Sequence, residues 1–267
     1  MSRTSFSKPT SKRDDAIRLG KKLKNDLIFL AAKGLFFLAA KIPLSVGLRL
    51  GSAIGRAAFF VLRPDRTKVL RHLKIAFPDS DLAWRKQTGA DSFRYLGRSF
   101  FELFHFDEIL TNEGAYHNYV VMEGEENLKK AAVSGGGGLV VTGHIGNWEL
   151  MAAWAGHRGY ILHPVIRKLY DERIDHLLND HRRRYKYPPI ARGGGPEGFE
   201  EIVSVLQRGE FLGILMDQDT KVRGTFAPFL GPLAHTPTGP AYLAYALDTD
   251  AMVAYTHRRR DGGTLSA

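Results

Sequence analysis

The sequence of 267 residues contains no cysteine, and it has fewer acidic than basic side chains. The first absence excludes disulfide bridges, thiolate metal sites, iron–sulfur clusters and a cysteine nucleophile. The second leaves 38 Lys and Arg against 28 Asp and Glu, a formal net charge of +10. This charge favours an anionic partner, whether nucleic acid, acidic lipid, a phosphorylated substrate or an acidic carrier protein.

The sequence also lacks several motifs that a basic enzyme of this size often carries. No H-x-x-x-H or H-E-x-x-H pair is present, and the four consecutive glycines at 135–138 are not followed by GK[ST]. A zinc hydrolase and a P-loop enzyme are therefore disfavoured, and we expect neither metal nor cofactor. No DNA-binding motif appears, and the basic residues are not interleaved with exposed-looking aromatics, so we expect no nucleic-acid partner.

The remaining composition is that of a globular protein. Hydrophobic residues make up 44% and charged residues 25% of the chain, which excludes collagen-like and fully disordered proteins. The length allows one or two domains.

Basic residues are concentrated at the N-terminus, before the first apolar segment. Residues 1–24 contain eight basic and two acidic side chains, and the first apolar run, 27–40, is interrupted only by Lys33. This run is shorter than the roughly 20 residues that cross a bilayer, and it lacks the usual cleavage site of a secretory signal. We expect a basic, partly disordered N-terminus over 1–24 and membrane-docking helices over 25–65. The alternative is a pair of core helices in a soluble domain.

Glycines recur at every fourth position of the second apolar helix, predicted from about residue 44 to residue 62. Gly47, Gly51 and Gly55 share one face of this helix, which predicts the close approach of another helix. The following residues, 66–115, are predicted to be helical, with aromatic side chains that favour core packing over a groove for a lipid chain.

The second half of the chain alternates strand and helix patterns, beginning with a glycine turn at 134–138. This alternation predicts an α/β fold with a mostly parallel central sheet flanked by helices, within a domain over 66–267. Functional side chains of such sheets follow the carboxyl ends of the strands, as His144 and Asp217 do here. The expected strands are 139–143, 160–166, 211–216 and 251–255. The expected helices are 171–185, 198–208 and one that begins within 236–239, where threonine can cap and proline can start a helix, and ends at about 247.

The segment His144-Ile-Gly-Asn-Trp-Glu149 is the candidate catalytic motif. His144 follows a strand, and Glu149 lies in the first turn of the next helix. The carboxylate of Glu149 is expected to accept a hydrogen bond from one imidazole nitrogen, which leaves the other nitrogen free to take a proton. No G-x-S-x-G elbow is present, so a covalent serine hydrolase is disfavoured. A purely structural histidine at a strand end is the alternative.

Several further motifs agree with this one in order and spacing. They are RTKVLRHLKIAFPDS, GRSFFE, the RRRY…ARGGG…LQRGEFLGILMDQD stretch and FAPFLGPLAHTPTGPAYLA. From about residue 43 to residue 255 the sequence resembles the late acyltransferases of lipid A biosynthesis, within the H-x4-D/E acyltransferase group. The resemblance implies a glycerolipid-acyltransferase-like fold and the transfer of a fatty acyl group from acyl carrier protein to a hydroxyl of a phosphorylated glucosamine lipid. It also implies work at the cytoplasmic face of the inner membrane.

The resemblance and the chemistry together define a candidate site. His144 is the expected general base and Glu149 its orienting carboxylate, with Arg167 as the donor to the developing oxyanion. Arg184, within a run of three arginines, suits a lipid phosphate or the carrier protein. The other residues expected to contact substrate are Asn147, Asp217, Gln218 and Asp219.

The sequence departs from the family pattern at Tyr255, where members usually have proline, and its C-terminal region is expected to be short. Acyl transfer to another glycolipid or phospholipid remains open as an alternative. A non-catalytic membrane-binding protein is the competing hypothesis, and it predicts lipid binding that survives loss of His144.

Overall fold

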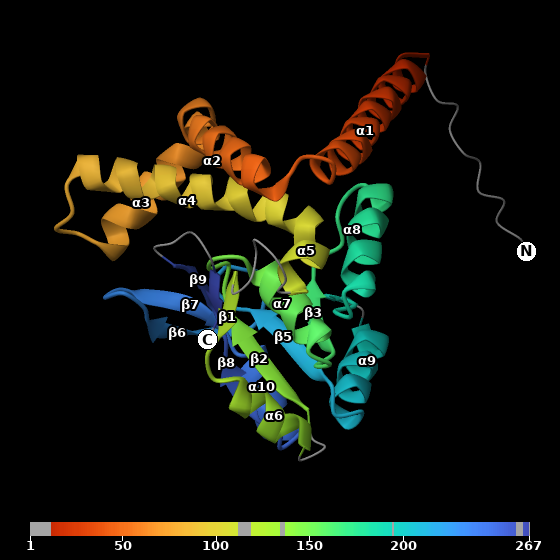
Figure 1. Cartoon of the computed structure of the whole chain (residues 1–267), viewed down its shortest axis with the longest axis vertical. Coiled ribbons are helices and arrows are strands. Elements are labelled where there is room, and N and C mark those ends of the chain that lie inside the picture. Colours follow the sequence, from red (N-terminus) through yellow and green to blue (C-terminus); the bar gives the residue numbers. More distant parts are fainter. Residues whose placement is uncertain (1–11, 112–118, 134–136, 194, 260–263, 267) are drawn as a thin grey trace, which may run out of the picture.

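The computed structural model describes residues 12–111, 119–133, 137–193, 195–259 and 264–266 (Figure 1). A layer of helices from the N-terminal part of the chain lies over a domain built on a β-sheet (Figure 1). The first eleven residues of the expected disordered N-terminus and positions 134–136 of the expected glycine turn lie outside the described residues.

The N-terminal layer consists of helices separated by short breaks. Pro43 lies in the break between α1 and α2, where it limits backbone hydrogen bonding. Asp81 caps α4, because its side chain accepts a hydrogen bond from the backbone of Trp84 at 2.6 Å. The helices are α1 (Lys12–Ala39), α2 (Leu44–Val61), α3 (Arg63–Ala76), α4 (Leu82–Glu102) and α5 (Phe106–Leu110), with a 3₁₀ turn at Leu103–His105.

The glycine stripe of α2 packs directly against α4, as its spacing predicts. Gly47, Gly51 and Gly55 are buried, and the backbones of the two helices approach closely. A Cβ atom at Gly51 would lie 2.2 Å from the carbonyl oxygen of Gly97, and one at Gly55 would lie 2.1 Å from that of Phe93. Glycine is therefore required at these crossing points.

One helix among the described residues, α2, is long and apolar enough to cross a membrane. Length and composition are weak evidence for a span. Only 28% of the helix is buried within the protein, because the glycine stripe is narrow. Large apolar side chains stay exposed on the rest of its surface, among them Val46, Leu50, Ile54, Phe60 and Val61.

The central sheet has five parallel strands in the order β4-β3-β5-β2-β8. This arrangement confirms the α/β fold class expected from the sequence. The strands are β2 (Gly138–Thr142), β3 (Leu162–Ile166), β4 (Ile190–Ala191), β5 (Phe211–Leu215) and β8 (Ala251–Val253).

Alternate residues of the strands pack against helices on the two faces of the sheet. Val140, Leu162 and Phe211 share one apolar cluster with Leu150 and Ala153 of α7. Leu139 and Leu212 point to the other face, where they pack with residues of α9 and α10. The helices of this domain are α6 (Glu125–Val133), α7 (Trp148–His157), α8 (Glu172–Arg184), α9 (Gly195–Gln207) and α10 (Gly239–Ala246).

Two small sheets lie where the sequence predicted none. A hairpin of β6 (Gly224–Pro228) and β7 (Leu233–Pro237) occupies the segment expected to be a Gly- and Pro-rich loop. Its turn contains Gly231 at φ +105°, a conformation that glycine adopts without strain. The other sheet joins β1 (Val120–Met122), β10 (Thr264–Ser266) and β9 (Thr256–Arg258).

Candidate active site

Two neighbouring strands of the sheet bring His144 and Asp217 together. Strands β2 and β5 are paired with Thr142 opposite Leu215, so each side chain follows its strand by two residues at the same edge. Asp217 Oδ1 lies 2.8 Å from His144 Nδ1, and Asp217 Oδ2 accepts the backbone N–H of His144 at 2.6 Å. Both side chains are about one-third exposed, so the pair is fixed in place and accessible to a substrate.

The contacts of the imidazole define its protonation. With Asp217 accepting at Nδ1, the neutral ring carries its hydrogen there and presents a lone pair at Nε2. The Gln218 amide nitrogen lies 3.4 Å from Nε2, and the ring packs edge-on against Trp148 with centroids 4.7 Å apart. Nε2 of His144, which has the Gln218 amide as a distant donor, therefore has the lone pair that a proton acceptor needs.

Glu149 contacts an arginine rather than the imidazole. We expected its carboxylate to orient His144, whereas Glu149 Oε1 and Oε2 accept hydrogen bonds from Arg182 at 2.5 and 3.1 Å. Gly146, at φ +63°, turns the chain between His144 and α7, which carries Glu149. The hydrogen bond that orients the imidazole is made to Asp217 instead. Local spacing could not predict this, because Asp217 meets His144 only through strand pairing.

The Glu149–Arg182 pair is largely buried, and its charges affect nearby groups. Burial lowers the pKa of Arg182, but the hydrogen bond and charge of Glu149 raise it above its ordinary value. Burial, followed by the charge of Glu149, raises the pKa of Tyr187 well above its ordinary value. Arg182 therefore stays cationic beside the cavity.

A cavity of about 660 Å³ opens beside His144 between the sheet and α7. Its inner wall is apolar, with Val140, Ala152, Leu162 and Leu215, whereas its mouth carries cations. The structure brings His144, Glu149, Arg167, Gln218 and Asp219 of the expected site to this cavity, together with Arg182, Arg192 and Lys221.

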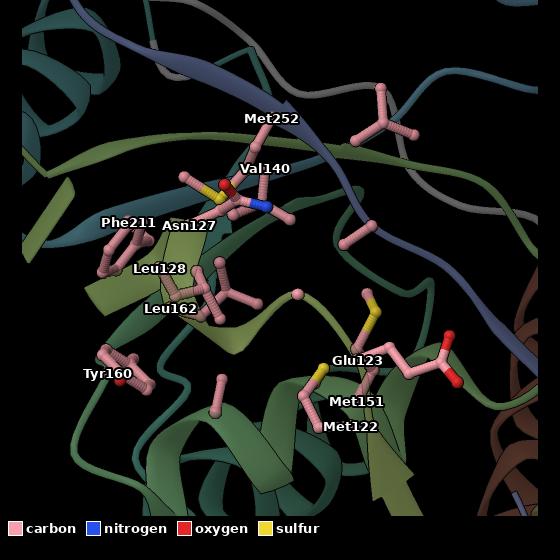
Figure 2. Close-up of a pocket in the computed structure, with 14 residues that line it drawn as sticks. Met122, Glu123, Asn127, Leu128, Val140, Met151, Tyr160, Leu162, Phe211 and Met252 are labelled. Carbon is pink, nitrogen blue, oxygen red and sulfur yellow. The ribbon is translucent and has the colours of Figure 1, made fainter. Parts of the chain in front are cut away.

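A smaller, mainly apolar cavity of about 80 Å³ lies beneath α7 (Figure 2). Both cavities are lined by Val140, Met151 and Leu162, so they adjoin on the same face of the sheet. The smaller cavity is completed by apolar side chains from β1, α6, β5 and β8, among them Met122, Leu128, Phe211 and Met252. The cavity that His144 lines and the smaller apolar cavity thus share part of one apolar wall.

Asp217, which was expected to contact substrate, is instead bound to His144 and is not among the residues that line the cavity. Two further residues expected to contact substrate are placed elsewhere. Asn147 is 2% exposed, and its amide is hydrogen-bonded to Glu102 and to the backbone of Leu150. Arg184 pairs with Asp107 at 2.6 Å beside a separate hollow. The structure therefore does not bring these two side chains to the cavity that His144 lines.

Two cations of the site, Arg192 and Lys221, were not singled out from the sequence, and Arg182 was considered only as a member of the arginine run. Arg182 belongs to the same arginine run as Arg184, but only the helical turn decides which member faces the cavity. Arg192 precedes the Gly run of ARGGG, and Lys221 follows Asp217-Gln218-Asp219-Thr220. For Arg192 and Lys221, their positions shortly after strands β4 and β5 were the available signal.

Comparisons with known proteins test the resemblance that the motifs indicated. The model of a family described as bacterial lipid A biosynthesis acyltransferase matches residues 19–266. A phosphatidylinositol mannoside acyltransferase of Mycobacterium tuberculosis is 26% identical over 162 residues, which are 60% of this chain and 51% of that protein. The chain thus spans about half the length of this relative.

A second relative aligns over more of the chain. The lipid A biosynthesis palmitoleoyltransferase of Escherichia coli is 26% identical over 228 residues, which are 85% of this chain and 72% of that protein. The match of the family model over nearly the whole chain confirms the resemblance found in the motifs: the chain belongs to the bacterial lipid A biosynthesis acyltransferase family.

Proposed function

We propose that the protein transfers a fatty acyl group from the thioester of acyl carrier protein to a hydroxyl of a phosphorylated glucosamine lipid, a lipid A precursor. The observation that carries the proposal is the His144–Asp217 hydrogen bond at the entrance of a cavity that is cationic outside and apolar within. Such a cavity suits an anionic headgroup and a hydrocarbon chain at once.

In the proposed reaction, Nε2 of His144 takes the proton of the acceptor hydroxyl as its oxygen attacks the thioester carbonyl carbon. Asp217 holds the proton on Nδ1 and stabilises the imidazolium that forms. The tetrahedral intermediate collapses with cleavage of the C–S bond, and the imidazolium returns the proton to the departing thiolate. The products are an ester and the free thiol, with no covalent bond to the protein.

The cations of the cavity mouth supply the remaining chemistry. Arg167, which follows β3 and is exposed, is the proposed donor to the developing oxyanion. Arg192 and Lys221 suit the acceptor's phosphate. Glu149 contributes by holding Arg182 beside the cavity.

The apolar wall of the cavity beside His144 is the proposed site of most of the acyl chain. The end of the chain is proposed to enter the smaller cavity beneath α7, which has a volume of about 80 Å³ (Figure 2). It adjoins the cavity beside His144, so a thioester carbonyl at the imidazole would direct its chain inward along the sheet. Exposed apolar residues of α1 and α2, together with the net positive charge, support action at the cytoplasmic face of an anionic inner membrane. Arg184, outside the cavity, remains available to an acidic carrier protein.

The test is an acyl-transfer assay with detergent-solubilised protein. Acyl carrier protein thioesters and a phosphorylated lipid A precursor are the substrates, and product is followed by mass spectrometry. We expect transfer by the wild type and a loss of roughly 100-fold or more in His144→Ala. His157→Ala, at the far end of α7, is the matched control and retains activity.

The mycobacterial similarity favours one alternative acceptor, a phosphatidylinositol mannoside, which forms a parallel arm of the assay. Transfer to this lipid alone would replace the lipid A precursor as acceptor. Membrane binding by folded wild type without transfer to either lipid would contradict the proposed function and favour a non-catalytic membrane-binding protein.

A further inference from the structure

A carboxylate that the proposed reaction does not use is buried behind the candidate active site. Glu102, the last residue of α4, is fully buried. It accepts hydrogen bonds from the Tyr119 hydroxyl at 2.5 Å, from Nδ2 of Asn147 at 2.6 Å and from both terminal nitrogens of Arg258. Arg258 also donates to the Ser99 hydroxyl at 3.0 Å. Glu102 thus joins the helical layer, the loop after β2 and strand β9.

This network holds the loop that carries His144. The Asn147 side chain caps α7 by accepting the Leu150 N–H at 3.0 Å, while its amide nitrogen is tied to Glu102. On the other side, the Thr256 hydroxyl accepts the Asn147 N–H at 2.6 Å and donates to the carbonyl of Ile145 at 2.9 Å. The loop is therefore held from α4 and from β9 at once.

Packing leaves the loop little freedom between these two attachments. A Cβ atom at Gly146 would lie 2.2 Å from both the carbonyl and the hydroxyl oxygen of Thr256. His144 lies two residues before this contact. A displacement of Asn147 or Thr256 would therefore move the imidazole relative to the cavity.

Stability alone does not account for a buried ion pair here. Replacing such a pair with apolar residues is often neutral or stabilising, because the desolvation of both charges offsets their attraction. Burial by itself raises the pKa of Glu102, but the hydrogen bonds and charge of Arg258, with smaller contributions from Tyr119 and Asn147, hold it below its ordinary value. What the charged form provides is directional hydrogen bonding to several segments.

We propose that Glu102 is a positioning residue for the reaction: paired with Arg258, it holds Asn147 and thereby the loop that directs His144 Nε2 into the cavity. Glu102 acts through Asn147 and does not touch the substrate. The kinetic consequence rests on the proposed function, whereas the control of the loop by Glu102 does not.

Asn147→Ser is the principal test variant. Serine is also a good helix N-cap, so this change keeps the cap of α7. It also leaves the Glu102–Arg258 pair intact and removes only the hydrogen bond from residue 147 to Glu102. We expect kcat to fall by ~10-fold or more with KM nearly unchanged, because the imidazole is displaced while the binding cavity is intact. Amide hydrogen exchange at Asn147 and Leu150 should become at least ~10-fold faster, with the thermal midpoint within a few degrees of wild type.

A second variant removes the ion pair without leaving an unpaired charge. Glu102→Met with Arg258→Met should fold, because methionine replaces both side chains with apolar groups of similar length. We expect the same loss of kcat and the same faster exchange, and adding Asn147→Ser should cause little further change, since both act on one link. Glu125→Gln, which disrupts a more exposed pair with Arg158, is the control and should leave both measurements at wild-type values.

The hydroxyl of Thr256 gives a rescue experiment. Thr256→Val removes the hydrogen bonds to the loop and should reduce kcat, whereas Thr256→Ser keeps them and should restore most of it. Wild-type kcat and exchange in a folded Asn147→Ser or Met/Met variant would overturn the inference. Hydrogen exchange tests whether Glu102 holds the loop even if no acyl transfer is measured. Failure of the inference about Glu102 is therefore distinguishable from failure of the proposed function.

Discussion

The chemistry of a histidine depends on which of its two nitrogens carries the hydrogen. In this protein the Asp217 carboxylate holds the hydrogen on Nδ1 of His144, while Nε2 is left toward the cavity. Glu149 forms an ion pair with Arg182 and does not orient the imidazole. Two carboxylates close to one another in space thus have separable roles, and single substitutions can tell them apart.

Asp217→Asn should reduce kcat by roughly 100-fold or more. The asparagine keeps the shape of the side chain, but its NH₂ group can donate to Nδ1 and so favour the tautomer with hydrogen on Nε2, which cannot act as the base. Steady-state kinetics at saturating acceptor measures the effect.

Glu149→Gln should instead raise KM for the phosphorylated acceptor, because Glu149 holds Arg182 beside the cavity. A larger loss of kcat in Glu149→Gln than in Asp217→Asn would contradict the assignment of Asp217 as the carboxylate that orients His144.

The acid stability of the protein should depend on Glu102. Its pKa is lower in the folded protein than the ordinary value of 4.5, so the unfolded chain binds this proton more readily. The contribution of the ionised group to the free energy of unfolding is therefore fully present above pH 4.5 and is lost as the pH falls through the folded-state pKa. Urea unfolding of wild type at neutral pH and at a series of pH values below 4.5 should show this loss.

The Glu102→Met/Arg258→Met variant provides the comparison for that titration. Its free energy of unfolding should fall less steeply below pH 4.5, because the group that gains the proton is gone. Equal slopes for the two proteins would show that other carboxylates account for the acid sensitivity.

Single residues also show how far local sequence patterns reach. His144 could be identified because it follows a buried strand, whereas its partnership with Asp217 required knowing that β2 and β5 are neighbours in the sheet. Glu102 was missed, since nothing local says that a glutamate at a helix end is buried. Two signals were available: Glu102 is the last residue of the GRSFFE motif, and it is a lone acid within the aromatic segment Phe100-Phe-Glu-Leu-Phe104.

At the scale of helices and strands, the contact of α2 with α4 depends on the absence of side chains. Gly51→Ala would place a methyl group 2.2 Å from the carbonyl of Gly97, and the helices would have to separate. We expect a loss of about 1–3 kcal/mol in the free energy of unfolding. Denaturant unfolding measures it.

Gly34→Ala in α1 is the matched control for this substitution. A Cβ atom at Gly34 meets no atom within 4 Å, so the change should be neutral or stabilise the protein by up to about 1 kcal/mol through helix propensity. Equal destabilisation by Gly51→Ala and Gly34→Ala would show that the close contact of α2 with α4 is not the reason why Gly51 is required.

The apolar cavity beneath α7 should select acyl chains by length. Ala155 lines this cavity and is nearly buried, so Ala155→Leu would occupy part of its volume. We expect the ratio of kcat/KM values to shift toward shorter acyl donors by ~10-fold. Ala246→Leu, on the exposed surface of α10, should leave the preference unchanged, and an unchanged preference in Ala155→Leu would place the acyl chain elsewhere.

The strand and helix pattern of the sheet domain was predictable because buried parallel strands form short apolar runs between amphipathic helices. The β6–β7 hairpin was not, since its two strands are rich in proline and glycine and contain largely exposed side chains such as Phe226 and Leu233. Strand β4 has only two residues, too few for any periodicity. Elements that are largely exposed, or too short to show a period, were therefore not predicted.

On the scale of the whole molecule, positive charge and exposed apolar surface occur together in the N-terminal layer. This combination should give binding to anionic vesicles that weakens with salt and is weak on neutral vesicles. Ile54→Glu, on the exposed part of α2, should reduce vesicle co-sedimentation severalfold. Val133→Glu on α6, also highly exposed, is the control and should have little effect; equal losses would argue against docking through α2.

The order of the strands has a consequence for how the site comes into being. Strand β5 lies between β3 and β2, although it is made after both, and it brings Asp217 to a histidine 73 positions earlier in the chain. During synthesis, His144 emerges first and has no carboxylate at Nδ1 until β5 inserts between strands that are already present. Pairing over such a separation is slow relative to local helix formation. The His144–Asp217 pair should therefore form late in folding. A nascent chain halted before residue 217 should contain every helix of the N-terminal layer and yet have no acyl-transfer activity.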